Sequence, residues 1–270
     1  MHYFELANGV IIPAVGLGTF PMNNRESARA VRTALRMGYE LLDTSASYGN
    51  ERGVGRGKSG MPSFITTKVS NSDQRRGAVR EAFSRSARAL KTKTIDLYLL
   101  HWPQPGHFQQ SWHEMEELYF EGLCRAIGVA NFHVHHLEDL MTNCRIVPMV
   151  NQIEIHPLLT QKDLLQFCYS HGILCEAYSP FARMAPRVVY NETLQTIATK
   201  HGKLTTQVIL RWNYQNGVVS IPKTSSSDRM ASNLDIFDFV LSDEEIRAID
   251  ALNQDYRVRH NPDTCDYTKL

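Results

Sequence analysis

The chain has 270 residues, of which 43% are hydrophobic and 21% charged, which is typical of a globular protein. Its formal net charge of +1, without a long basic run, argues against nucleic acid or another polyanion as a partner. Every apolar run is shorter than the ~20 residues that span a bilayer, and the first residues lack the basic start of a secretion signal, so we expect a cytoplasmic protein with no membrane partner.

The cysteine and histidine patterns predict neither disulfides nor a metal site. The five cysteines are odd in number and show no C-x-x-C spacing, which favours reduced thiols. His133, His135 and His136 lie in a polar, helical stretch without a recognisable metal-ligand spacing. We therefore expect no bound metal.

The first predicted element is a β-hairpin. Residues 4–14 turn around Asn8-Gly9, a pair that favours a tight turn between two strands. Because it precedes the first of the repeating units described next, we expect the hairpin to cap the N-terminal end of the fold.

From residue 16 onward, short β-rich apolar runs alternate with longer stretches of helical period. The eight predicted strands cover residues 16–20, 40–44, 63–68, 96–101, 125–130, 149–154, 174–179 and 218–223. The predicted helices between them cover residues 26–37, 79–90, 112–122, 162–171, 192–201 and 205–215.

This alternation, in units of roughly 25–30 residues, predicts parallel strands joined by helical crossovers. An open doubly wound sheet and a closed eight-stranded barrel both have such units. The length and the number of units favour the barrel, which takes ~250 residues. We predict an α/β fold: a single (β/α)8 TIM barrel domain over residues 1–270, with the N-terminal β-hairpin as a cap.

The glycine-rich segment RGVGRGKSG, residues 52–60, invites two nucleotide-binding interpretations. It fails as a P-loop because Arg52 stands where the first glycine is required, but it matches G-x-G-x-x-G at Gly55, Gly57 and Gly60. A dinucleotide loop follows a strand and opens a helix, whereas this segment precedes a predicted strand. We predict a short, solvent-exposed loop.

Polar side chains stand where the predicted strands end. In a parallel barrel these ends converge on one face, where several strands contribute catalytic residues. The residues at or just after the strand ends include Gly18, Thr19, Phe20, Asp43, Tyr48, Lys68, His101, Trp102, Asn131, Gln152, Tyr178, Ser179, Lys223 and Thr224. An acid, a phenol, an amine and an imidazole from three consecutive strands indicate a catalytic site rather than a set of solvated strand ends.

Over its whole length the chain resembles the aldo-keto reductases. The motifs that carry the resemblance, in order, are GLGTF from Gly16, LDTSASYGNE from Leu42, FITTK from Phe64, DLYLLHWP from Asp96, AIGVANF from Ala126, MVNQIEIHP from Met149, AYSP from Ala177, IPKT from Ile221 and DIFDFVLS from Asp235. The compact length is similar to the microbial diketogluconate-reductase-like and prostaglandin-F-synthase-like branch. The resemblance implies a barrel that binds NADPH in extended form without a Rossmann fold.

The resemblance also implies a catalytic tetrad of Asp43, Tyr48, Lys68 and His101. Carbonyl reduction needs a hydride, which NADPH supplies, and a proton for the oxygen. A nearby ammonium lowers the pKa of a phenol from about 10, so Lys68 can make Tyr48 a better proton donor. Asp43 would hold Lys68 charged, and His101 would orient the carbonyl.

The cofactor-binding residues carry over in the same way, and they include Gly18 and Thr19. Asn131 and Gln152 resemble the amides that bind the carboxamide, and Tyr178 resembles the ring that stacks on the nicotinamide. The residues implied along the pyrophosphate are Ser179, Phe181 and Arg183. Those implied at the adenosine 2′-phosphate and the adenine are Lys223, Thr224, Ser225, Arg229 and Asn233, and their cations and hydroxyls favour NADPH over NADH.

The chain departs from the family pattern at several positions. Ala130 stands where serine is usual, so one hydrogen bond to the carboxamide is missing. Phe20 stands where many relatives have tryptophan or tyrosine, so we expect a wider or more polar substrate pocket, with Phe20 and Trp102 as substrate-binding residues and Trp102 as the main aromatic wall. The polar tail from Arg257 either folds over the pocket or trails in solvent.

We predict a monomeric enzyme that reduces aldehydes and ketones to alcohols with NADPH. Small dicarbonyls, aryl aldehydes and keto-sugars are the candidate small-molecule substrates. The alternative is a non-catalytic NADPH-binding sensor or regulatory subunit on the same barrel, similar to the potassium-channel β-subunits. The complete set of Asp43, Tyr48, Lys68 and His101 argues against that alternative.

Overall fold

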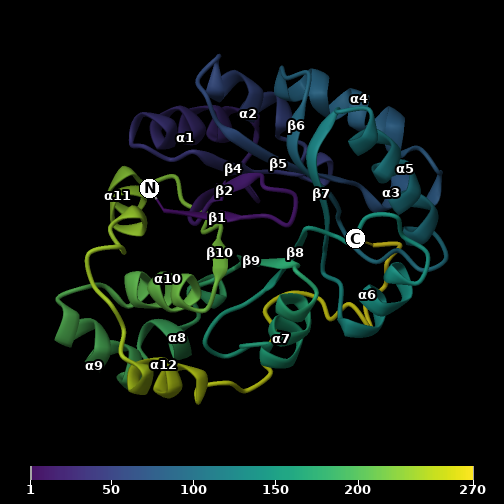
Figure 1. Cartoon of the computed structure of the whole chain (residues 1–270). Helices are drawn as coiled ribbons and strands as arrows, with labels where there is room; N and C mark the ends of the chain where they lie inside the picture. Colours follow the sequence, from purple (N-terminus) through teal and green to yellow (C-terminus); the bar gives the residue numbers. More distant parts are fainter. Residues whose placement is uncertain (1, 270) are drawn as a thin grey trace.

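A ring of eight parallel strands forms the centre of the protein, in a computed structural model that describes residues 2–269 (Figure 1). The strands are β3 (Gly16–Gly18), β4 (Leu41–Asp43), β5 (Phe64–Val69), β6 (Ile95–Leu100), β7 (Cys124–Ala130), β8 (Val150–Glu154), β9 (Leu174–Tyr178) and β10 (Val218–Ser220). Each strand pairs with the next in the chain, and parallel bridges Val15–Ser220 and Gly18–Lys223 join the last strand to the first. The predicted barrel is confirmed.

The predicted hairpin is also present, as β1 (Tyr3–Glu5) paired antiparallel with β2 (Ile11–Pro13). Ile12 of the hairpin packs in one apolar cluster with Leu41 and Phe64, the first residues of β4 and β5. The hairpin therefore covers the end of the barrel where the strands begin. In Figure 1 it is drawn in purple across the ring of strands.

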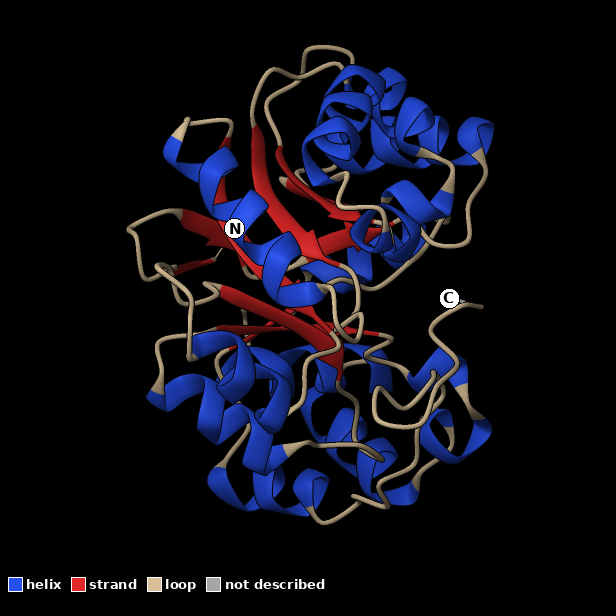
Figure 2. Cartoon of the chain, turned by 90° about the vertical axis from the view of Figure 1, so that its right-hand side faces the viewer, coloured by secondary structure: helices blue, strands red, loops and turns tan. Residues whose placement is uncertain are grey.

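Helices surround the strands on the outside (Figure 2). They are α1 (Asn24–Arg36), α2 (Glu51–Lys58), α3 (Asn71–Arg75), α4 (Val79–Leu90), α5 (Phe108–Phe120), α6 (Val134–Met141), α7 (Lys162–Ser170), α8 (Pro186–Val189), α9 (Glu192–His201), α10 (Thr205–Gln215), α11 (Ser227–Leu234) and α12 (Asp243–Asp250), with the 3-10 turns η1 (Ala46–Tyr48) and η2 (Ala182–Met184). The six predicted helices all form, and three of them have the predicted bounds. Within residues 2–269, no helix is both long enough and apolar enough to span a membrane.

The predicted glycine-rich loop is wrong, because most of it is helix α2. The glycines let α2 approach α1 and α4 closely. A Cβ atom built on Gly53 would lie 2.1 Å from Ser27 Oγ, and one built on Gly55 would lie 2.4 Å from the Ala89 carbonyl oxygen. Contact with two neighbouring helices therefore outweighs the low helix propensity of glycine here.

At the end where the strands begin, side chains fill the interior of the barrel. Side chains from different strands, such as Leu41, Leu97, Val150 and Val219, are fully buried and form one apolar cluster. A polar cavity therefore has room only at the opposite end, where the strands finish.

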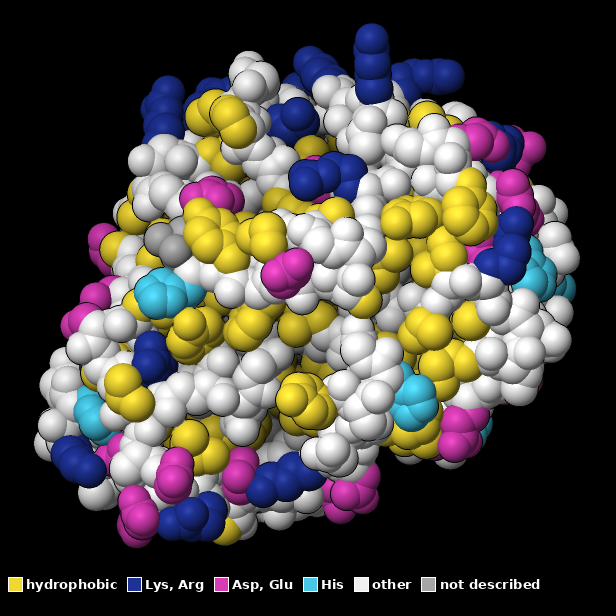
Figure 3. Space-filling view, viewed as in Figure 1, with side chains coloured by type: hydrophobic (Ala, Val, Ile, Leu, Met, Phe, Trp, Pro, Cys, Tyr) yellow, Lys and Arg dark blue, Asp and Glu magenta, His cyan; other side chains and the backbone are white. Residues whose placement is uncertain are grey.

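Charge is distributed unevenly over the surface. Figure 3 shows lysine and arginine side chains gathered along its upper edge, over α1, α2 and α4. On α1 the exposed cations are Arg25, Arg29, Arg32 and Arg36. The net charge of +1 therefore conceals a basic side of the molecule.

Candidate active site

Most of the predicted site residues surround one cavity of about 550 Å³ at the C-terminal ends of the strands. Those that line it are Gly18, Thr19, Phe20, Asp43, Tyr48, His101, Trp102, Asn131, Gln152, Tyr178, Ser179, Phe181, Arg183, Lys223 and Arg229. Lys68 lies directly behind the wall that Asp43 and Tyr48 form. Thr224, Ser225 and Asn233 are not part of the lining.

Asp43 and Lys68 form a buried ion pair between β4 and β5. The Lys68 ammonium donates to both carboxylate oxygens of Asp43, at 2.7 and 2.9 Å, and to the Thr44 carbonyl oxygen at 2.8 Å. Burial alone would lower the pKa of Lys68, but the charge of Asp43 and its hydrogen bonds outweigh burial and raise that pKa. The lysine is therefore positively charged at neutral pH and held in one position.

Tyr48 brings a phenol to this cation. It is the last residue of η1, and its hydroxyl oxygen lies 3.5 Å from Lys68 Nζ. Burial raises the pKa of Tyr48, and the positive charge of Lys68 offsets only part of that increase. The phenol therefore keeps its proton at neutral pH and stands next to a cation that would stabilise the phenolate if the proton left. The expected net decrease in its pKa is thus not found, because desolvation is the larger effect.

His101 follows β6 and packs edge-on against Tyr48, with ring centroids 5.7 Å apart. Burial and the charge of Lys68 hold the pKa of His101 well below its usual value, so the ring is neutral. Its Nδ1 shares a hydrogen bond of 3.1 Å with Ser45 Oγ, which also accepts from the Ser47 backbone N–H. This contact holds the imidazole ring in place beside Tyr48.

A second buried acid, Glu176 on β9, stands behind the site and was missed in the sequence. The Gln152 amide nitrogen donates to Asp43 Oδ2 at 2.7 Å and to Glu176 Oε2 at 2.6 Å. Burial and the nearby charge of Asp43 raise the pKa of Glu176 to about 8, so this carboxyl is protonated at neutral pH. A charged residue inside the apolar run LCEAY was the available signal.

Asn131 and Tyr178 are joined by a hydrogen bond, in which the Tyr178 hydroxyl donates to Asn131 Oδ1 at 2.6 Å. The Asn131 amide nitrogen donates to the His101 carbonyl oxygen at 2.9 Å. These contacts hold the ends of β6, β7 and β9 together, and they fix both predicted nicotinamide-side residues before any ligand binds.

Lys223 and Arg229 form the other end of the cavity. Both side chains are exposed, and neither has an acidic partner among residues 2–269. Thr224 is buried nearby, where its hydroxyl accepts from the Ser226 backbone N–H at 3.1 Å. Two unpaired cations at one end of a cavity suit an anionic ligand.

Ser225 and Asn233 occupy different environments. Ser225 is exposed just before α11. Asn233 is buried, and its side chain forms a hydrogen bond with Tyr39. Burial raises the pKa of Tyr39, and this hydrogen bond offsets part of the increase. A direct role for either residue stays a prediction.

Comparison with known proteins decides the family. The sequence profile of the Aldo/keto reductase family matches residues 14–254. The chain is 48% identical to glyoxal reductase of Bacillus subtilis over 265 residues, covering 96% of this chain and 95% of the relative. It is 39% identical to methylglyoxal reductase DkgA of Escherichia coli K12 over 266 residues, covering 96% of each. The crystal structure of a Gox0644 mutant in complex with NADPH superposes with a TM-score of 0.94, at 38% identity and 98% coverage of both chains.

The chain belongs to the aldo/keto reductase family. It is therefore an oxidoreductase of carbonyl compounds, and the cavity at the strand ends is its candidate active site. The resemblance inferred from the ordered motifs is confirmed.

The tail of this aldo/keto reductase folds over the active-site cavity. Glu154, the last residue of β8, accepts hydrogen bonds from the backbone N–H groups of Val258, at 2.6 Å, and Arg259, at 3.1 Å. In Figure 1 the yellow chain runs from α12 past α7 and α6 to the C-terminus. Of the two alternatives for the tail, the structure has the folded one.

The tail also completes the cavity wall, which the sequence did not indicate. Arg259, His260 and Lys269 line the cavity. The rings of His260 and Tyr267 pack edge-on against Trp102, each with centroids 6.4 Å apart. Trp102 still lines the cavity, but with the tail packed against it only a small part of its side chain is exposed.

Proposed function

We propose that this aldo/keto reductase uses NADPH to reduce small dicarbonyls and aryl aldehydes to alcohols, with Tyr48 as the proton donor. The observation that carries the proposal is the position of the Tyr48 hydroxyl, 3.5 Å from an ammonium that both oxygens of Asp43 hold in place. A phenolic proton donor needs this arrangement, in which a buried hydroxyl lies next to a fixed cation, and few other roles do.

The residues of the cavity fit NADPH. Aldo/keto reductases use this cofactor, and structural neighbours were solved with it. Lys223 and Arg229 supply two cations that have no acidic partner within residues 2–269, which suits a dianionic 2′-phosphate and favours NADPH over NADH. Tyr178, Asn131 and Gln152 line the cavity nearer to Tyr48, as expected for residues that hold the nicotinamide. When bound, NADPH supplies the hydride.

The protein's own side chains manage the proton. The Tyr48 hydroxyl donates its proton to the carbonyl oxygen as that oxygen gains negative charge. The Lys68 ammonium stabilises the phenolate that remains, and Asp43 keeps Lys68 aimed at it. His101 is neutral, and its Nε2–H tautomer would donate a hydrogen bond to the same carbonyl oxygen.

The substrate class rests on the cavity walls and on the relatives. Phe20 stacks at an angle near Tyr48, with centroids 5.0 Å apart, and gives the cavity an apolar side for an aryl or small alkyl group. Similar proteins are named for the reduction of glyoxal and methylglyoxal. Small dicarbonyls are therefore the first substrates to test, and keto-sugars are the next.

The experiment compares NADPH oxidation by the wild type, Tyr48→Phe and Tyr169→Phe, with methylglyoxal and a nitrobenzaldehyde as substrates. Loss of a general acid lowers kcat/KM by about 10²–10⁴-fold, so Tyr48→Phe should lose most activity while its NADPH affinity stays the same. Tyr169 is 82% exposed on α7, and the same chemical change there should leave activity intact.

Two results would contradict the proposal. Substantial turnover by Tyr48→Phe would mean that another group delivers the proton. A wild type that binds NADPH but reduces none of a broad panel of carbonyl compounds would instead favour the non-catalytic sensor.

A further inference from the structure

A cluster of imidazoles and a carboxylate lies outside the active site, where α6 meets the C-terminal tail. We propose that His133, His136 and Asp263 bind a divalent transition-metal ion of the Zn²⁺ type, with His135 able to serve as a fourth ligand. The bound ion would fasten the tail to the barrel. The inference does not depend on the proposed substrate or proton donor.

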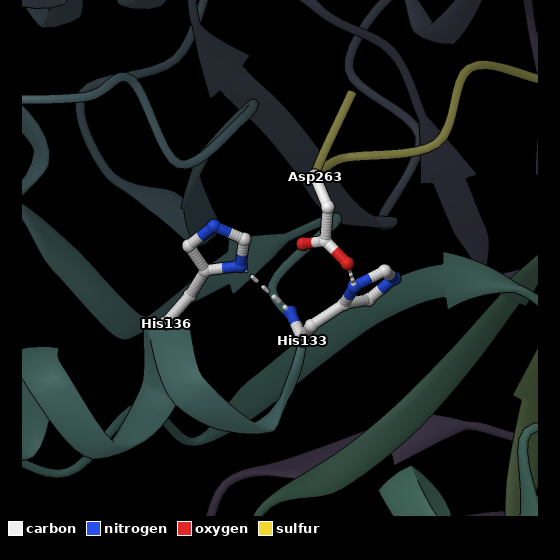
Figure 4. Close-up of side chains that lie close together, drawn as sticks. All are labelled: His133, His136 and Asp263. Carbon is white, nitrogen blue, oxygen red and sulfur yellow. Dashed lines mark hydrogen bonds and ion pairs between the residues drawn. The ribbon is translucent and has the colours of Figure 1, made fainter. Parts of the chain in front are cut away.

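The ligand atoms are already close together. His133, His136 and Asp263 each offer one ligand atom, and these atoms lie within 4.8 Å of one another (Figure 4). Ligands of a tetrahedral Zn²⁺ with bonds of about 2.0–2.1 Å are about 3.3 Å apart, so shifts of about 1 Å would complete the site. His135 Nε2 lies 3.5 Å from the other carboxylate oxygen of Asp263.

The donor chemistry suits such an ion. Imidazole and carboxylate are ordinary Zn²⁺ ligands, and imidazole must be neutral to bind. His133 and His136 are both half-buried beside Asp263. Asp263 is exposed, which leaves a path for the ion to enter.

The present hydrogen bonds compete with the ion. His133 Nδ1 bonds Asp263 Oδ2 at 2.9 Å, and His136 Nδ1 accepts from the His133 backbone N–H at 3.2 Å. On the other side of the ring, Arg257 donates to His133 Nε2 at 2.9 Å. Metal binding through Nδ1 of His133 would put the imidazole proton on Nε2, which could then no longer accept from Arg257. The same guanidinium nitrogen also donates to Gln161 Oε1 at 3.3 Å, so Arg257 would turn toward Gln161. The hydrogen bond from Arg257 to His133 therefore opposes metal binding.

The position of Asp263 gives the site a consequence for the active site. Asp263 is three residues beyond His260, which lines the catalytic cavity and packs on Trp102. It is four residues before Tyr267, which packs on the same tryptophan. An ion between α6 and Asp263 would hold this stretch of the tail down over the cavity.

The proposal revises the expectation of no metal. The spacing of His133 and His136 alone is not a recognisable motif, and the carboxylate comes from a segment about 130 residues later in the chain. Only the fold brings the tail to the start of α6, so the sequence pattern could not reveal the site.

The test titrates the whole 270-residue chain, freed of metal by EDTA, first with Zn²⁺ by calorimetry and then with Co²⁺ by visible absorption. We expect one Zn²⁺ per chain at about micromolar concentration and intense Co²⁺ bands typical of a tetrahedral site. Asp263→Asn and His133→Asn should each weaken binding by about tenfold or more. Asparagine is chosen to replace His133 because it can still cap the N-terminus of α6.

Two further variants sharpen the test. His171→Asn removes an exposed imidazole at the end of α7 and should leave binding unchanged, whereas Arg257→Gln should tighten it because an opposing cation is gone. Hydrogen–deuterium exchange of residues 257–269 should slow several-fold with Zn²⁺ in the wild type and stay the same in Asp263→Asn.

Absence of stoichiometric Zn²⁺ binding would overturn the proposal. So would binding that survives both Asp263→Asn and His133→Asn, because it would come from scattered surface histidines. Binding at the site without any change in exchange of the tail would refute the fastening role.

Discussion

The two ends of the active-site cavity differ in how their cations are partnered. At one end Lys68 is fully buried, and its ammonium donates to Asp43 and to the Thr44 carbonyl oxygen. At the other end Lys223 and Arg229 are exposed, without an acidic partner among residues 2–269. The first end is organised by the protein itself, whereas the second is open to an anionic ligand.

This difference has a physical basis. On the proposed function, carbonyl chemistry requires a proton donor whose position and charge do not change when substrate arrives, so its partners are built into the fold. Cofactor binding requires groups that exchange water for phosphate, and such groups must stay accessible before the ligand binds. Substitutions at the two ends should therefore affect different measured quantities.

The largest effect is expected from Lys68→Met at the buried end. This change leaves Asp43 buried without its counter-ion, so the free energy of unfolding should fall by about 3–5 kcal/mol, and turnover should fall with it. Urea denaturation followed by tryptophan fluorescence measures the stability. Lys200→Met removes an exposed cation paired with Glu245 and should cost about 0–1 kcal/mol. Equal losses in the two variants would mean that the buried pair has no special role.

A second effect at the same end comes from Glu176→Gln and depends on pH. The pKa of Glu176 rises from an ordinary 4.5 to about 8 on folding, so the folded state keeps a proton that the unfolded chain releases. The stability that this proton provides is complete below the unfolded pKa and is lost as the pH rises toward 8.

Glu176→Gln removes that dependence while keeping the shape of the side chain. The variant should gain stability relative to the wild type, by on the order of 3 kcal/mol, as the pH rises from about 5 to 8. Urea denaturation of both proteins across this range measures the difference. Parallel stability curves would show that Glu176 is ionised in the folded protein.

The smallest effects are expected at the open end. Charge-assisted hydrogen bonds contribute about 1.5–3 kcal/mol each, so Arg229→Met and Lys223→Met should each raise the dissociation constant for NADPH by about 10- to 100-fold. NADH, which lacks the 2′-phosphate, should bind both variants as it binds the wild type. Arg32→Met, an exposed cation on α1, is the matched control. Equal weakening of NADPH and NADH would place the 2′-phosphate elsewhere.

The buried end was largely predictable from the sequence, because it follows from regular elements. The alternation of strands and helices places Asp43, Lys68 and His101 at neighbouring strand ends, and a barrel brings those ends together. The chemistry of an acid, an amine, a phenol and an imidazole then suggests their roles. Glu176 was missed because a buried neutral carboxyl has no pattern in sequence; its environment decides its charge.

Features that depend on contacts between distant segments were not predictable. Helix α2 looked like a loop because glycine disfavours helices in isolation, and the close approach of α1 and α4 is visible only in the fold. The polar tail gave no sign of its position, because it is held by partners such as Arg75, which donates to the Tyr267 carbonyl oxygen at 3.1 Å. The contribution of Arg259 to the cavity wall was hidden for the same reason.

The most direct measurement determines two quantities for both Tyr48→Phe and Arg229→Met. These are the dissociation constant of NADPH, by fluorescence titration, and the rate of a single turnover with methylglyoxal at saturating NADPH. We predict that Tyr48→Phe binds NADPH like the wild type but turns over about 10²–10⁴-fold more slowly, and that Arg229→Met binds weakly but turns over at the wild-type rate once saturated. If both variants lose affinity and rate together, the two ends of the cavity do not have separate roles.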